Sequence, residues 1–232
     1  MDINMKMIKA LFLLILMNSF TVQGYEGNLK SVYSVLEEFN LQAGTNEVNE
    51  QFVFTYAVRA SNALSIDWSS GNKKDTSDEL LRLWEGKSEL NALDSIGLLK
   101  STRFKVELAG YLGAGIDKCL VTYDKNVLRF FVVNYLEDRN ARMRIAAIRN
   151  LGFVGNNQDI EYLSKVVKKQ LEGWSQHAAS SLDLIGTKES VGALIKLHDE
   201  VTDPALHDFM DSITSQYSNG VKLASSCNLS NN

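Results

Sequence analysis

The segment Asp138–Gly152, DRNARMRIAAIRNLG, limits the possible folds of this 232-residue chain more than any other stretch. It opens with an acid, which Arg144 follows six residues later. The pair Ala146-Ala147 is small enough to let a neighbouring helix approach closely. The closing glycine predicts the end of a helix, because glycine readily adopts the left-handed conformation of a helix C-terminus. We therefore expect a helix that packs against others of its kind.

A second, weaker copy of this segment lies 34 residues later, where Ile185-Gly186 corresponds to Leu151-Gly152. The residues after each copy correspond at the same offset: Ile160 to Leu194, Leu163 to Leu197, and Val167 to Val201. An earlier unit ends at Gly113, and its longer loop holds Cys119. Repeats of this length are typical of stacked helical pairs, because one pair cannot bury its apolar face alone.

The remainder of the chain also predicts helices, since Pro204 is its single proline. The apolar periodicity predicts helices at Leu29–Phe39, Val48–Leu64, Ser101–Leu112, Asp124–Leu136, Ala141–Leu151, Asp159–Lys169, Trp174–Ile185 and Glu189–Glu200, with a short one through Leu90 that ends at Gly97. Thr76–Glu79 has the form of a capping box at a helix start. Asp203 and Pro204 predict the cap and first turn of a last helix.

These features resemble the HEAT-like helical repeat family, in its short form without a proline kink, over roughly Ser101–Val201. The resemblance implies an all-α fold: an α-α superhelix, or solenoid, of helical pairs with additional N-terminal helices. It also implies that Asp138 and Arg144 belong to an acid–arginine ladder between repeats. The ladder is at most partial, because Lys105 and Ala178 occupy the arginine position of the other units.

In this family the return helices usually line the ligand-facing side. The resemblance therefore makes five residues candidate contacts for a protein partner: Tyr162, Lys165, Lys169, Lys196 and Asp199. The alternative for each of them is a solvated helix face.

The first 24 residues have the form of a secretory signal. Lys6 and Lys9 precede the apolar run Ala10–Met17, and Val22-Gln23-Gly24 fits a peptidase site. The alternative, an uncleaved anchor, needs about 20 apolar residues and this run is shorter. We expect an exported protein, periplasmic or secreted, without a membrane span after cleavage.

Removal of this segment leaves 22 basic and 27 acidic residues, a net charge of −5. Nucleic acids and anionic membranes attract positively charged protein surfaces, so we expect no nucleic-acid partner.

Cys119 and Cys227 are the two cysteines, and export predicts one disulfide between them. Two unpaired thiols are the alternative.

We divide the chain into a signal peptide (1–24), an N-terminal helical region (25–100), a HEAT-like repeat region (101–217) and a flexible tail (218–232).

Two clusters contain residue types that can act in catalysis or bind a metal ion. His177 and Ser181 share a helix face, but no third group completes a catalytic set. The second cluster contains His198, Asp199, His207 and Asp211, and it would bind a metal ion only if two helices converged there.

We therefore expect no catalytic residues, no metal site and no cofactor. The leading hypothesis is an exported, non-enzymatic α-solenoid that binds another protein as an interaction or scaffold module. The alternative is an all-α exported enzyme that acts on a polysaccharide or a peptide, since a helical fold excludes no chemistry.

Overall fold

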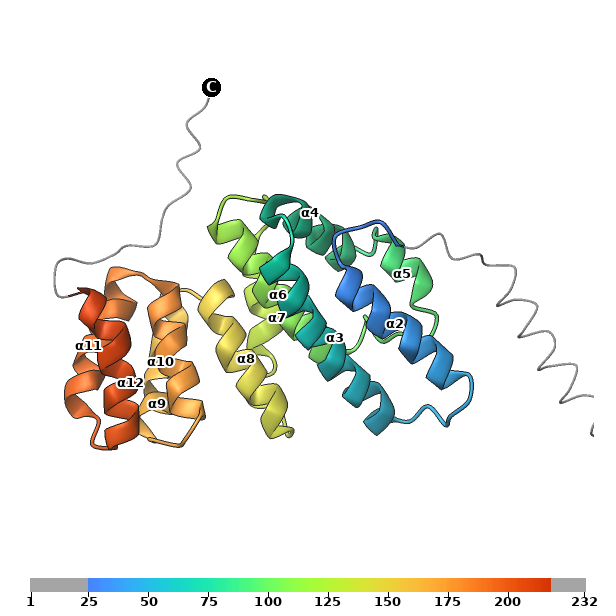
Figure 1. Cartoon of the computed structure of the whole chain (residues 1–232). Helices are drawn as coiled ribbons and strands as arrows, with labels where there is room; N and C mark the ends of the chain where they lie inside the picture. The colour runs from blue at the N-terminus through green and yellow to red at the C-terminus, as the bar shows by residue number, and fades with distance from the viewer. Residues whose placement is uncertain (1–24, 218–232) are drawn as a thin grey trace, which may run out of the picture.

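The computed structural model describes residues 25–217, and this part of the chain is helical without strands (Figure 1). The helices are α2 (Lys30–Ala43), α3 (Glu50–Ser70), α4 (Lys73–Trp84), α5 (Glu89–Leu93), α6 (Thr102–Asp117), α7 (Lys125–Val133), α8 (Ala141–Val154), α9 (Ile160–Lys168), α10 (Trp174–Ile185), α11 (Lys188–Glu200) and α12 (Pro204–Thr214). The 3₁₀ turns Asn157–Asp159 and Ser215–Tyr217 precede α9 and follow α12. The predicted all-α fold is confirmed.

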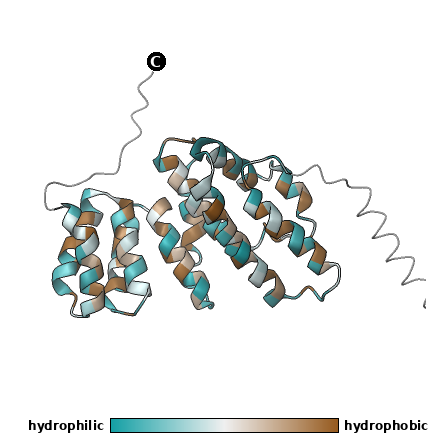
Figure 2. Ribbon diagram, in the orientation of Figure 1, coloured by the Kyte–Doolittle hydropathy of each residue, from teal (hydrophilic) through white to brown (hydrophobic). Residues whose placement is uncertain are grey.

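The helices α3, α6, α8 and α10 pack against one another in that order, and α7, α9 and α11 return beside them. Each helix carries both hydrophobic and hydrophilic residues (Figure 2), so the apolar ones can face the neighbouring helices. Among residues 25–217, no helix is both long enough and apolar enough to span a membrane.

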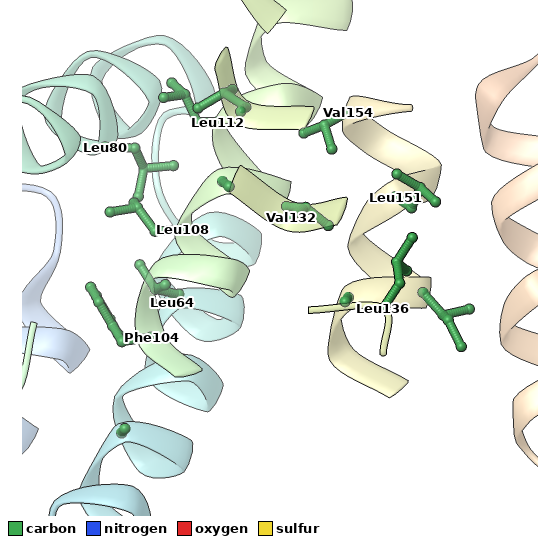
Figure 3. Close-up of a cluster of buried hydrophobic side chains, with 14 of the residues drawn as sticks. Leu64, Leu80, Phe104, Leu108, Leu112, Val132, Leu136, Leu151 and Val154 are labelled. Atoms are coloured by element: carbon green, nitrogen blue, oxygen red, sulfur yellow. The ribbon is translucent and has the colours of Figure 1, made fainter. Parts of the chain in front are cut away.

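One apolar cluster extends through the whole described chain, from Leu29 before α2 to Met210 on α12. Figure 3 shows its centre, where Leu80 of α4, Leu108 of α6 and Val154 of α8 are drawn among their neighbours. The core is therefore continuous across residue 100, where the sequence pattern changes.

The helices α6 and α8 do not end at the glycines that the sequence pattern predicts as their ends. The helix α6 continues past Gly113 to Asp117, and α8 continues past Gly152 to Val154. Only α10 ends as predicted, at Gly186 with a φ of 63° in the left-handed region.

Gly113 and Gly152, which lie inside helices, are at places where helices touch. A Cβ atom on Gly113 would lie 2.9 Å from the carbonyl oxygen of Phe153 on α8. A Cβ atom on Gly152 would lie 3.0 Å from the Cα of Ser181 on α10. These glycines permit the close approach of neighbouring first helices, which is the role that we had assigned to the alanine pair of α8.

The prediction for the start of α4 was wrong. The helix begins three residues earlier than Thr76, and its N-cap is Asn72, whose side chain accepts from the amide of Lys74 at 2.9 Å. Thr76 is fully buried instead, and Glu79 accepts a hydrogen bond from Ser88 at 2.5 Å. Tertiary burial thus overrides a local capping pattern here.

The N-terminal helices are joined by buried carboxylates. Asp67, near the end of α3, accepts hydrogen bonds from the amides of Ser31 at 2.9 Å and Val32 at 3.0 Å. It therefore caps the first turn of α2 from another helix. Tyr25, the residue predicted to begin the mature chain, stacks on Tyr33 with ring centroids 5.3 Å apart.

Candidate binding surface on the return helices

The most exposed aromatic side chain in the described chain belongs to Phe130 on α7, with a relative exposure of 70%. Val127, one turn earlier on the same face, is 45% exposed. The opposite face of α7 is buried, because Leu128 and Val132 have no exposed surface. A solvated phenylalanine costs free energy that burial against a partner would recover, so this pair is an anchor-like feature.

The sequence contained a signal for this exposure. The periodicity of Asp124–Leu136 predicts a core face with Leu128, Phe131, Val132 and Tyr135, and Phe131 does pack edge-to-face on Trp84 with centroids 5.5 Å apart. Successive residues of a helix are about 100° apart, so Phe130 lies about 160° from both Leu128 and Val132 and points away from the core. We did not single it out because a Phe-Phe pair looks like core.

A bidentate ion pair holds α7 rigidly against the start of α9. Arg129 donates from Nε to Asp159 Oδ2 at 2.7 Å and from Nη2 to Oδ1 at 2.6 Å. Asp159 is buried, and the hydrogen bond to its carboxylate raises the pKa of Arg129. Arg129 therefore stays charged, while the neighbouring side chains of Val127 and Phe130 face solvent.

Three of the five predicted contacts lie on or just after α9. Tyr162 is half-buried, and its hydroxyl donates to the carbonyl oxygen of Leu136 at 3.0 Å, so it joins α9 to the turn that follows α7. Burial raises the pKa of Tyr162, which stays a donor. Lys165 is exposed and pairs with Glu161 at 2.7 Å, and Lys169 is exposed at the C-cap.

The other two predicted contacts lie on α11. Lys196 is exposed, 3.9 Å from Glu200, and Glu200 also pairs with Lys168 of α9 at 2.9 Å. Asp199 is exposed, with its Oδ1 3.3 Å from Nδ1 of His198. The five residues thus lie on or just after the adjacent return helices α9 and α11, with Tyr162 serving mainly as a structural contact.

The expected link between repeats uses different atoms. Arg144 donates to the carbonyl oxygen of Asp138 at 2.6 Å, whereas the Asp138 carboxylate accepts from the amide of Asn140 at 2.7 Å. The Arg144 guanidinium lies 4.9 Å from the ring centroid of Trp174 on α10. Within residues 25–217, a cation–π contact therefore joins these two units at Arg144, in place of an acid–arginine ladder.

The histidine–serine pair on α10 has a packing role. Ser181 is fully buried, and its hydroxyl donates to the carbonyl oxygen of Ile148 on α8 at 2.7 Å. Burial, together with the nearby charge of Arg149, lowers the pKa of His177. The hydroxyl is already used between two helices, so the pair lacks an available nucleophile.

A buried charged cluster lies between α6 and α8. The Glu107 carboxylate contacts the guanidinium groups of Arg103, at 2.5 Å, and Arg149, and it accepts from Asn150 at 2.9 Å. Two cations and an amide surround one carboxylate, which compensates its desolvation. We assign this cluster to helix packing.

An open depression of about 990 Å³ lies between the N-terminal ends of α3 and α8. Asn49 and Asn140 cap these helix ends, and Glu50 and Arg142 lie beside them. Glu50 is the one carboxylate among the described residues that line it. Hydrolysis of a glycosidic bond commonly uses a pair of carboxylates, so this depression does not favour the enzyme hypothesis.

The histidine–acid cluster does form, because α11 and α12 converge there. His198 Nε2 lies 2.7 Å from Asp211 Oδ1, and His207 Nδ1 lies 3.3 Å from Asp211 Oδ2. Burial lowers the pKa of His198, but its hydrogen bonds to Asp211 and Asp199 outweigh that effect and raise the pKa overall.

Comparison of the chain with models of protein families, with curated proteins and with solved structures gave no match.

The resemblance to HEAT-like repeats therefore remains a prediction from the residues. The predicted bridge involves Cys227, which lies outside the described residues together with the signal peptide and the tail, so it also stays a prediction.

Proposed function

We propose that this chain is an exported, non-enzymatic helical array, of the HEAT-like solenoid type, that binds another protein through its return helices. The observation that carries the proposal is the exposure of Phe130 beside Val127 on a face of α7 with a fully buried opposite side. Anchors of protein interfaces are typically large aromatic side chains on rigid supports, surrounded by polar residues that exclude water.

The surroundings of this pair fit a binding surface. The ion pair of Arg129 with Asp159 fixes α7, so the face needs little rearrangement on binding. The exposed lysines of α9 and α11 supply a polar rim, which includes Lys165 and Lys196. These cations favour a partner surface with acidic residues around an apolar centre.

The experiment is affinity capture from the source organism's envelope or medium with three purified forms of the mature chain Tyr25–Asn232. We expect the wild type to retain a protein that Phe130→Asp loses. The matched control is Ile66→Asp on α3, because Ile66 is 57% exposed and lies on a different helix. The control should retain the same protein as the wild type.

Two outcomes contradict the proposal. If Phe130→Asp and Ile66→Asp retain the same proteins as the wild type, the α7 face is not the binding surface. If the wild type retains no protein and hydrolyses a polysaccharide or a peptide, the enzyme hypothesis replaces the binding one.

A further inference from the structure

We propose that His198, His207 and Asp211 form a binding site for a divalent transition-metal ion, Zn²⁺, at the junction of α11 and α12. One ligand atom from each of these residues lies within 4.8 Å of the other two. Their rings and carboxylate therefore lie close together before any ion binds, and the proposal does not depend on the exposed residues Val127 and Phe130 of α7.

The donor set selects the class of metal. Two imidazoles and one carboxylate suit Zn²⁺, whereas Ca²⁺ and Mg²⁺ prefer oxygen ligands alone. The two imidazole rings lie with their centroids 4.3 Å apart, and both face the Asp211 carboxylate. Three protein ligands plus one water molecule complete the tetrahedral coordination that zinc adopts in many proteins.

Asp199 supplies the supporting contact that histidine ligands of zinc usually have. Its Oδ1 lies 3.3 Å from Nδ1 of His198, while Nε2 of the same ring faces Asp211. A proton on Nδ1 leaves the lone pair of Nε2 available to coordinate the ion, and the contact with Asp199 fixes the orientation of the ring. Asp199 is thus a positioning residue in this site.

The framework of the site is rigid before any ion binds. His207 and Asp211 are one turn apart on α12, and the side chain of Met210 between them is fully buried. The loop between α11 and α12 is also held, since Gln170 accepts from the amides of Thr202 at 2.9 Å and Asp203 at 2.7 Å. Little ordering of the chain is needed, which favours binding.

The test is a titration of the purified chain, prepared without a polyhistidine tag, with Zn²⁺ in competition with a chromophoric chelator. We expect saturable binding of one ion per chain, no binding of Mg²⁺, and an increase in the melting temperature with Zn²⁺. His207→Ala and Asp211→Asn should each weaken Zn²⁺ binding at least tenfold, and Asp199→Asn about tenfold.

Asp208→Asn is the matched control, because Asp208 is exposed on the same helix but lies outside the cluster. It should bind Zn²⁺ like the wild type. Circular dichroism in a chelator checks that each variant is folded, and His207→Ala is the safest test because its side chain is 41% exposed. The proposal is overturned if Zn²⁺ binding is not saturable, or if folded His207→Ala binds it as tightly as the wild type.

Discussion

At the scale of single residues, close contacts between helices explain why two glycines have a role different from the one that the sequence pattern predicts. Gly113 and Gly152 looked like helix ends, and both lie inside helices against the neighbouring backbone. A glycine permits a left-handed turn and also a close approach, and the local sequence does not distinguish the two uses. Gly186 does end its helix, since its backbone has a left-handed φ of 63° and α11 begins two residues later at Lys188.

Gly113→Ala should destabilise the protein by about 1–3 kcal/mol, because the added methyl group would overlap the backbone of α8. The matched control is Gly192→Ala on α11, where an added Cβ meets nothing within 4 Å. That change should stabilise the protein by up to about 1 kcal/mol through helix propensity. Urea denaturation of both variants measures the difference, and equal effects would contradict the packing role of Gly113.

At the scale of elements, the helices follow from periodicity, while their links depend on residues far apart in sequence. The bounds of α10 were predicted correctly, and Asp203 with Pro204 begins α12 as expected. The start of α4 was missed, because Thr76 and Glu79 are buried by tertiary contacts. The pairing of Arg129 with Asp159 spans 30 residues, and no local pattern announces it.

Asp159→Asn should lower the free energy of unfolding by about 1.5–3 kcal/mol, because it removes the negative charge and one of the two oxygens that accept from Arg129. Glu161→Gln is the control, since its ion pair with Lys165 is solvent-exposed and contributes little. Thermal and urea unfolding measure both variants. A loss of stability in Glu161→Gln as large as that in Asp159→Asn would show that burial of the pair is irrelevant.

Unfolding measurements on Phe130→Asp separate the contribution of this residue to stability from its contribution to binding. Phe130 lies beside Arg129 but points into solvent, so Phe130→Asp should leave the free energy of unfolding almost unchanged. A large loss of stability in that variant would assign Phe130 to packing rather than to recognition. The candidate anchor was within reach of sequence reasoning, because the helical period directs it away from the core face.

At the scale of the whole molecule, the continuous core from Leu29 to Met210 makes the helices before and after residue 100 one packed unit. The change of sequence pattern near residue 100 therefore does not correspond to a break in the core. We expect a single cooperative unfolding transition, since contacts between α3, α4 and α6 couple both regions.

The predicted disulfide between Cys119 and Cys227 belongs to this scale, because it would tie the tail to the loop between α6 and α7. Intact mass after alkylation should increase only when the chain is reduced first. Cys227→Ser should destabilise the chain by about 2–4 kcal/mol, and Cys119→Ser by the same amount. Alkylation of both thiols without reduction would show that the cysteines are unpaired.

The helical class and most helix positions could be predicted from the residues alone, because amphipathic periodicity and helix-breaking residues act locally. Packing between helices sets which glycines are contacts, that Arg144 reaches Trp174, and that His198 and His207 converge on Asp211. These outcomes depend on distances between side chains and backbone atoms of different helices. Local propensity contains no information about such distances, and packing sets them.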